Sequence, residues 1–195
     1  MCSHYAPSIP RENFTAMTRL DQNRARAQLA ARIGVSIENV KNVIIWGNHS
    51  STQFPDAKHA MVNIQGTSKS VSSVINNNEY LTSEFVETVQ KRGAAVINAR
   101  KMSSAMSAAK AASDHMHDWW NGTAAGEFVS MGVISDGSYG AAKDVIFSFP
   151  VVIRHKKWSI VQDLTVDEFA KSQLTITGNE LLEEKEEAMA VCSQD

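Results

Sequence analysis

The segment Asn42-Val-Ile-Ile-Trp46 constrains the fold most strongly, because apolar side chains follow one another without interruption from Val43 to Trp46. A run of this kind is typical of a strand that is covered on both faces. It stops at Gly47-Asn-His-Ser-Ser51, a stretch of small and polar residues. Loops held by a rigid scaffold often carry binding and catalytic side chains. The segment therefore predicts a buried strand followed by a loop in which His49 is a candidate functional residue.

The rest of the chain predicts helices and strands that do not alternate regularly. The Ala-, Leu- and Arg-rich residues 19–33 favour a helix with one buried face, which Gly34 ends. Further patterns favour helices over 80–92, 103–120 and 177–189, and strands over 12–18, 59–66, 128–134, 145–153 and 158–161. We also expect a loop or a weak turn over 68–78, a break or kink at Gly93, and a cap for the last helix at Thr177. This order indicates an α+β fold rather than a strictly alternating α/β fold.

The composition excludes several classes of function. The chain has 195 residues, 43% of them hydrophobic, and a net charge of −2, which suits one domain, or one domain plus part of another. Such scattered charge argues against nucleic acid or a membrane surface as a partner bound by charge alone. Cys2 and Cys192 stand at opposite ends and form neither a metal cluster nor a disulfide framework. With no apolar run of about 18 residues and no signal-peptide pattern, we expect a soluble, cytoplasmic protein.

Asp21, Arg24 and His49 are the candidate site residues. Asp21 and Arg24 share one face of the predicted helix, at positions i and i+3. An arginine can bind a carboxylate with two hydrogen bonds, and an aspartate can orient a histidine that exchanges a proton with a substrate oxygen. The three residues together suit a substrate with a carboxylate and a hydroxyl or carbonyl group. Each residue alone also has an ordinary explanation, as a surface ion pair or a loop histidine.

The segment Asp114-His-Met-His-Asp118 is a second candidate cluster, because it has the residue types of a metal site. Helical two-histidine sites place their ligands at i and i+4, whereas His115 and His117 point apart. We therefore interpret this segment as a solvated helix end. Trp119 and Trp120, which follow it, are interpreted as core or subunit-contact residues.

Longer motifs surround the three candidate residues. The segments Thr18-Arg-Leu-Asp-Gln-Asn-Arg-Ala25 and Val43-Ile-Ile-Trp-Gly-Asn-His-Ser-Ser51 resemble the catalytic region of malate dehydrogenases of the cytosolic type, in the lactate/malate dehydrogenase family. The resemblance continues in order through Gln90–Ile97, Ser103–Lys110, Gly126–Ile134 and Phe147–Ile153, and it covers essentially residues 6–190. It implies the C-terminal catalytic domain of that family, an α+β unit with a twisted, largely antiparallel sheet packed on long helices.

The resemblance also implies a reaction and residue roles. The family reaction is the reversible, NAD-dependent oxidation of malate to oxaloacetate. In that reaction His49 would be the proton donor and acceptor, Asp21 its partner, and Arg24 the residue that binds the substrate carboxylate. Ser104 and Ser107 would lie near the nicotinamide and the substrate. Members of the family are expected to form homodimers.

The family pattern is incomplete in this sequence. The family begins with a dinucleotide-binding fold whose G-x-G-x-x-G turn places the cofactor diphosphate at a helix N-terminus, and the sequence contains no such motif. A mobile loop with two further substrate arginines is absent as well. We expect residues 1–17 to be a remnant of the dinucleotide-binding domain and residues 18–195 to be the substrate-binding catalytic domain, in a truncated chain that is inactive alone. The alternative is a non-catalytic interaction module that pairs with full-length malate dehydrogenase.

Overall fold

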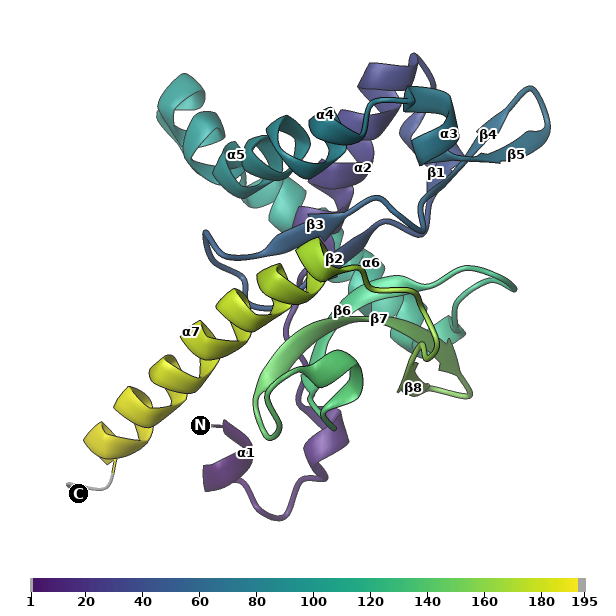
Figure 1. Cartoon of the computed structure of the whole chain (residues 1–195). Helices are drawn as coiled ribbons and strands as arrows, with labels where there is room; N and C mark the ends of the chain where they lie inside the picture. The colour runs from purple at the N-terminus through teal and green to yellow at the C-terminus, as the bar shows by residue number, and fades with distance from the viewer. Residues whose placement is uncertain (1, 193–195) are drawn as a thin grey trace.

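The strands form three small sheets around which the helices pack (Figure 1). The computed structural model describes residues 2–192. The sheets have the orders β1 (Val40–Lys41)–β4 (Met61–Ile64)–β5 (Thr67–Ser70), β2 (Ile44–Trp46)–β3 (Phe54–Asp56), and β6 (Val129–Ile134)–β7 (Ile146–Arg154)–β8 (Lys157–Ile160). Every strand pair among residues 2–192 is antiparallel. The predicted α+β class with largely antiparallel strands is confirmed, with the strands divided among three sheets.

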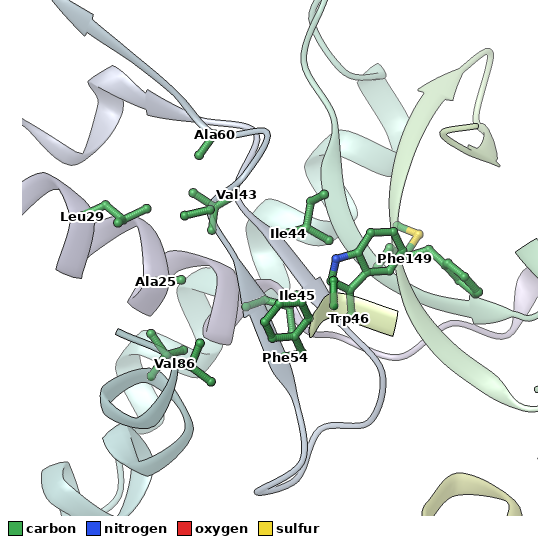
Figure 2. Close-up of a cluster of buried hydrophobic side chains, with 14 of the residues drawn as sticks. Ala25, Leu29, Val43, Ile44, Ile45, Trp46, Phe54, Ala60, Val86 and Phe149 are labelled. Carbon is green, nitrogen blue, oxygen red and sulfur yellow. The ribbon is translucent and has the colours of Figure 1, made fainter. Parts of the chain in front are cut away.

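Strand β2 lies in the core, as its apolar sequence predicts, and its three residues are fully buried. Figure 2 shows Val43 on the side of Leu29 from α2 (Arg19–Ile33), and Ile44 and Trp46 on the side of Phe149 from β7. The Trp46 and Phe149 rings meet edge to face, with 6.2 Å between their centroids. Burial of a side chain of this size contributes about 1.5–3 kcal/mol. The strand is therefore covered on both faces.

The end of β2 is joined to β7 of the third sheet. Gly47 N donates to Ser148 O at 3.1 Å, and Ser148 N donates to Gly47 O at 2.9 Å. The hydroxyl of Ser148 also donates to Ile45 O at 2.6 Å. The loop of residues 47–53, which contains His49, therefore starts at a residue whose N–H and C=O are both bonded to β7.

Helix α2 packs against this core and ends where the sequence predicts. Gly34 adopts a left-handed conformation with φ 82°, and its N–H donates to Ala30 O at 2.8 Å. Near the other end, the Gln22 side chain donates to Val43 O at 2.9 Å and accepts from Ser130 N at 3.1 Å. These bonds tie the start of α2 to β6 and to Val43, the residue before β2. Helices α5 (Glu84–Arg100) and α6 (Ala105–Asn121) both contact α2.

Helix α7 (Glu168–Cys192) has 25 residues and extends from beside β3 to the C-terminus (Figure 1). The prediction that Thr177 caps this helix is wrong. The helix begins earlier, where Asp167 Oδ1 accepts from Ala170 N at 2.9 Å, and Thr177 lies buried inside it. At the far end, the hydroxyl of Tyr5 in α1 (Cys2–Tyr5) lies 3.4 Å from Cys192 O. Within residues 2–192, no helix is long and apolar enough to cross a membrane.

Two predictions for irregular or extended segments are also wrong. Residues 12–18 form no strand, because Pro10 begins the 3-10 turn η1 (Arg11–Asn13), and only Ala16 pairs with Gly132 in an isolated bridge. Residues 68–78 are not a loop, because they include the end of β5 and the helix α3 (Val71–Ile75). Ser70 Oγ accepts from Ser73 N at 3.2 Å, so a serine that suggests a loop is in fact a helix cap.

The predicted break at Gly93 is misplaced. The interruption falls at Ser83, with φ −126° and ψ −83°, between α4 (Asn78–Thr82) and α5. Gly93 lies inside α5, where an added Cβ would be 3.6 Å from Arg24 Nη1. Gly93 therefore lies next to the Arg24 side chain, at a distance where an added Cβ would make an ordinary contact. The remaining short elements are η2 (Ile37–Asn39) and η3 (Ser138–Gly140).

Candidate active site

Asp21 and His49 are joined by a hydrogen bond. His49 Nδ1 lies 2.5 Å from Asp21 Oδ2. The Asp21 side chain is fully buried at the start of α2, whereas the His49 side chain is 59% exposed. Because an ionised carboxylate only accepts hydrogen bonds, Nδ1 carries the proton in this pair. The other ring nitrogen, Nε2, is then available to accept a proton from a ligand or, in the imidazolium form, to donate one.

The pKa of His49 is raised above its ordinary value. The main cause is the hydrogen bond to Asp21, and the negative charge of Asp21 adds to it. Partial burial and the positive charge of Arg24 lower the pKa but do not cancel the rise. The imidazolium form is therefore stabilised at this position, as proton transfer to a substrate oxygen would require.

Arg24 is the third member of the site, and its side chain is 15% exposed. Its Nη1 lies 3.4 Å from Asp21 Oδ1, and its Nη2 donates to Ser104 Oγ at 3.0 Å. The contact with Asp21 is long for a hydrogen bond, so the guanidinium is only loosely held on that side. The Arg24 guanidinium can therefore still form two hydrogen bonds with a carboxylate ligand.

The structure places the two candidate serines differently. Ser104, just before α6, contacts Arg24 directly. Ser107 is exposed on the first turn of α6, and the hydrogen bonds of Asp21, Arg24 and His49 among the described residues do not include it. The structure therefore brings together Asp21, Arg24, His49 and Ser104, and leaves Ser107 at the surface nearby.

Helix α7 binds the loop that carries His49, a relationship that the sequence did not suggest. Asn48 N donates to Thr177 Oγ1 at 2.8 Å, and Asn48 Nδ2 donates to Glu180 Oε2 at 2.9 Å. Ser50 Oγ and Thr52 Oγ1 each lie 2.5 Å from the same oxygen of Glu180. The only signal in the sequence is that Thr177 and Glu180 share a helix face, which does not identify their partners.

The ionised form of Glu180 is favoured by this arrangement. Burial by itself would raise the pKa of Glu180, but the hydrogen bonds from Ser50, Thr52 and Asn48 together lower it below its ordinary value. Glu184, one turn further along α7, accepts a second bond from Asn48 Nδ2 at 2.9 Å. The loop is thus bound to carboxylates on one face of α7.

The cluster at residues 114–118 is not the solvated helix end that the sequence predicts. His115 is buried, and its Nε2 lies 3.0 Å from Thr15 Oγ1. Asp118 forms an ion pair with the buried Arg19 at 2.5 Å. Helix α6 contacts α2 through the Asp118–Arg19 pair, and it contacts the segment before α2 through His115 and Thr15. The sequence of residues 114–118 does not reveal these partners. No group of three potential metal ligands occurs among the described residues, and His117 is exposed.

The site is open to solvent rather than enclosed. A cavity of about 700 Å³ lies elsewhere, between α1, the start of β7 and the second half of α7, and is lined by residues such as His4, Arg11, Ile146 and Lys185. Asp21, Arg24 and His49 do not line it. Of the three site residues His49 is the one at the surface, with 59% of its side chain exposed, whereas Asp21 is fully buried and Arg24 is 15% exposed.

Comparisons with known proteins agree with the motifs. Residues 18–192 match the family model for the lactate/malate dehydrogenase α/β C-terminal domain. The cytoplasmic malate dehydrogenase of Rattus norvegicus is 57% identical over 192 residues, which are 98% of this chain and 58% of that protein. The one from Caenorhabditis elegans is 58% identical over 187 residues, covering 96% and 56% of the two chains. The chain therefore spans less than two thirds of the length of these relatives.

Solved structures agree with the fold as well. The Trichomonas vaginalis lactate dehydrogenase in complex with NADH and oxamate superposes with a TM-score of 0.93 at 33% identity, covering 98% of this chain and 59% of that one. The malate dehydrogenase from Naegleria fowleri gives a TM-score of 0.85 at 43% identity, covering 94% and 55%. The chain belongs to the lactate/malate dehydrogenase family, whose α/β C-terminal domain it contains.

Proposed function

We propose that this chain provides the substrate-binding and proton-transfer part of an NAD-dependent malate dehydrogenase, which interconverts malate and oxaloacetate. The observation that carries the proposal is the buried Asp21 bonded to His49, with Arg24 beside both. His49 Nε2 takes the hydroxyl proton of malate, and returns it to the carbonyl oxygen in the reverse direction. Arg24 binds the substrate carboxylate. Asp21 stabilises the imidazolium that forms.

The cofactor would supply the hydride chemistry, and we assign its binding to a part of the enzyme other than the described residues. The sequence has no G-x-G-x-x-G turn, and the strand pairs among residues 2–192 are all antiparallel, whereas dinucleotides bind at a parallel sheet. These features do not fit NAD. We also assign residues 1–17 to the end of a dinucleotide-binding domain and residues 18–195 to the catalytic domain, since the family match starts at residue 18.

The 195-residue polypeptide alone is then expected to have little or no dehydrogenase activity. Besides the absence of a G-x-G-x-x-G turn, the His49 side chain is exposed to water, whereas enzymes exclude water around the reacting atoms. Because the relatives carry the word cytoplasmic in their names, we propose the same compartment.

A second candidate function is a non-catalytic module that associates with full-length malate dehydrogenase. Large apolar side chains on α6 favour this possibility, because Met106 is 81% exposed and Trp120 is 67% exposed. Exposed apolar surface of this kind is typical of an interface. We expect the purified chain to self-associate, as a homodimer or with longer relatives. A monodisperse monomer in size-exclusion chromatography, alone and mixed with a full-length relative, would contradict this association.

Binding of L-malate and oxamate to the purified chain, followed by NMR, tests the proposed function. We expect weak saturable binding, with a Kd of about 1 mM or higher, equivalent to about −4 kcal/mol. Arg24→Gln should abolish it, while Arg100→Gln, a change of an exposed arginine on α5, should leave it unchanged. Equal binding by wild type and R24Q would refute the assigned role of Arg24. NAD-dependent malate oxidation by the chain alone, at the ordinary enzyme scale of about 1–10³ s⁻¹, would refute the expected inactivity.

A further inference from the structure

We propose that Thr177 and Glu180 of α7 are positioning residues, which hold the loop of residues 47–53 so that His49 stays bonded to Asp21. The inference rests on the proposed function, in which His49 transfers the proton. It adds two residues outside Asp21, Arg24 and His49 to those that the site requires. The position of His49 would then depend on α7, a helix that forms no hydrogen bond to Asp21 or Arg24 among the described residues.

His49 has little support of its own. Its side chain is 59% exposed, and among the described residues its ring is hydrogen-bonded to Asp21. Ordering a loop residue costs conformational entropy of its backbone and of its side chain. One hydrogen bond makes a net contribution of similar size, because it replaces a hydrogen bond to water. The bond to Asp21 alone is therefore comparable to the cost of ordering, and neighbouring contacts decide the position of the ring.

Those neighbouring contacts come from α7 on both sides of His49. Before it, Asn48 N donates to Thr177 Oγ1 at 2.8 Å, and Asn48 Nδ2 donates to Glu180 at 2.9 Å. After it, Ser50 Oγ and Thr52 Oγ1 lie 2.5 Å from Glu180 Oε2. Both flanks of the histidine are thus bonded to one rigid helix.

The chemistry of residue 180 matters as well as its shape. A single carboxylate oxygen faces three donors, from Asn48, Ser50 and Thr52. Bonds to an ionised acceptor are roughly twice as strong as neutral ones. Glutamine has the same length, but its amide oxygen is a neutral acceptor, so its bonds to the three donors would be weaker. Glu180→Gln should therefore loosen the loop without removing side-chain volume.

Thr177 binds the same loop through its own hydroxyl group. It is fully buried, and its hydroxyl lies 2.8 Å from Asn48 N and 2.9 Å from Thr52 Oγ1. Thr177→Val keeps the shape but removes the acceptor, so that Asn48 N is left without its partner. Thr177→Ser keeps the hydroxyl and should restore the behaviour of wild type.

The experiment is NMR titration of His49 in the full chain without ligand or cofactor. We expect the pKa of His49 to fall toward its ordinary value in Glu180→Gln and Thr177→Val, by part of the fall that Asp21→Asn causes. Glu183→Gln, at an exposed position on α7, is the matched control and should change nothing. Thr177→Ser should titrate as wild type.

The outcomes separate this inference from the proposed function. An unchanged His49 titration in both E180Q and T177V overturns the inference. Changes spread over the other histidine signals, or loss of the folded spectrum in both variants, would show a general structural role and overturn it too. Malate binding by wild type is measured separately, so its absence would remove the proposed function while a shifted His49 titration would still support the positioning role.

Discussion

Gly47 and Thr177 pack so closely that no side chain fits at residue 47. An added Cβ would lie 2.1 Å from Thr177 Cγ2 and 2.3 Å from its hydroxyl oxygen. Gly47 also has φ +89°, a conformation that is unfavourable for residues with a Cβ. The end of the strand β2 and the middle of α7 are therefore in direct backbone-to-side-chain contact, directly before the loop that carries His49.

Gly47→Ala should be strongly destabilising. Left-handed backbone costs roughly 1–2 kcal/mol in a residue with a Cβ, and overpacking adds about 1–3 kcal/mol. Urea unfolding should therefore show a loss of about 2–5 kcal/mol. Gly34→Ala is the control, because Gly34 has φ +82° but open space around its Cβ position, and it should show only the backbone part. Equal losses in the two variants would mean that the contact with Thr177 relaxes easily.

Asp21→Asn should lower the pKa of His49 toward its ordinary value, because the bond to Asp21 is the main cause of its rise. NMR titration of the histidine side chains measures this directly. The other five histidines are internal controls, and His59, which contacts Thr165 O, should not respond. If the pKa of His49 stays raised in D21N, the carboxylate is not its cause.

The same pair makes stability depend on pH. A raised pKa means that the folded chain binds more protons than the unfolded chain between the two pKa values. The His49–Asp21 interaction therefore contributes fully below pH 6.5, the ordinary histidine value, and is lost as pH rises through the folded pKa. Asp21→Asn should accordingly lose more stability at acidic pH than at pH 9. A pH-independent difference between D21N and wild type would contradict this linkage.

Much of this site could be predicted from local sequence. Asp21 and Arg24 share a helix face through the i, i+3 spacing, and the apolar residues before Gly47 indicate the buried strand that ends near His49. That the histidine would meet Asp21 came from the resemblance. The role of Thr177 and Glu180 could not be predicted, because their partners lie far away in sequence and hydroxyl and carboxylate groups on a helix are usually solvated.

Partners that lie far away in sequence also explain the wrong predictions for Thr177 and His115. Thr177 is a good capping residue, so it suggested a helix start, but Asp167 caps earlier and the tertiary contact places Thr177 in the interior. His115 reads as a solvated residue because Asp114 and Asp118 flank it. Its burial depends on Thr15 and Arg19, which approach from another segment.

His115 should make the chain less stable in acid. Burial lowers its pKa most, and the charge of Arg19 lowers it further, while Asp118 opposes them. The unfolded chain then binds the proton more readily, so stability falls as pH decreases through 6.5 toward the folded pKa. Urea unfolding at pH 8 and pH 5.5 should show this loss reduced in His115→Gln. His117→Gln, an exposed position on the same helix, should keep the dependence of wild type; a loss equal to wild type in H115Q would contradict the role of His115.

Asp118→Asn should destabilise the packing of α6 on α2. The Arg19 side chain is 8% exposed and that of Asp118 is 22% exposed, so the variant leaves a charge buried without its counter-charge, at a cost of about 3 kcal/mol. Glu127→Gln breaks the exposed pair with Lys41, whose side chains are 37% and 41% exposed, and should cost less than about 1 kcal/mol.

A double variant separates the loss of the ion pair from the cost of leaving the Arg19 charge buried without a counter-charge. Arg19→Met with Asp118→Asn removes the buried charge, and should recover much of the stability that Asp118→Asn loses, because a neutral side chain of similar length carries no desolvation cost. Denaturant unfolding of the three variants beside wild type measures each difference. If D118N and E127Q lose equal amounts, or if the double variant loses more than D118N, then the unpaired charge of Arg19 is not what destabilises the helix contact.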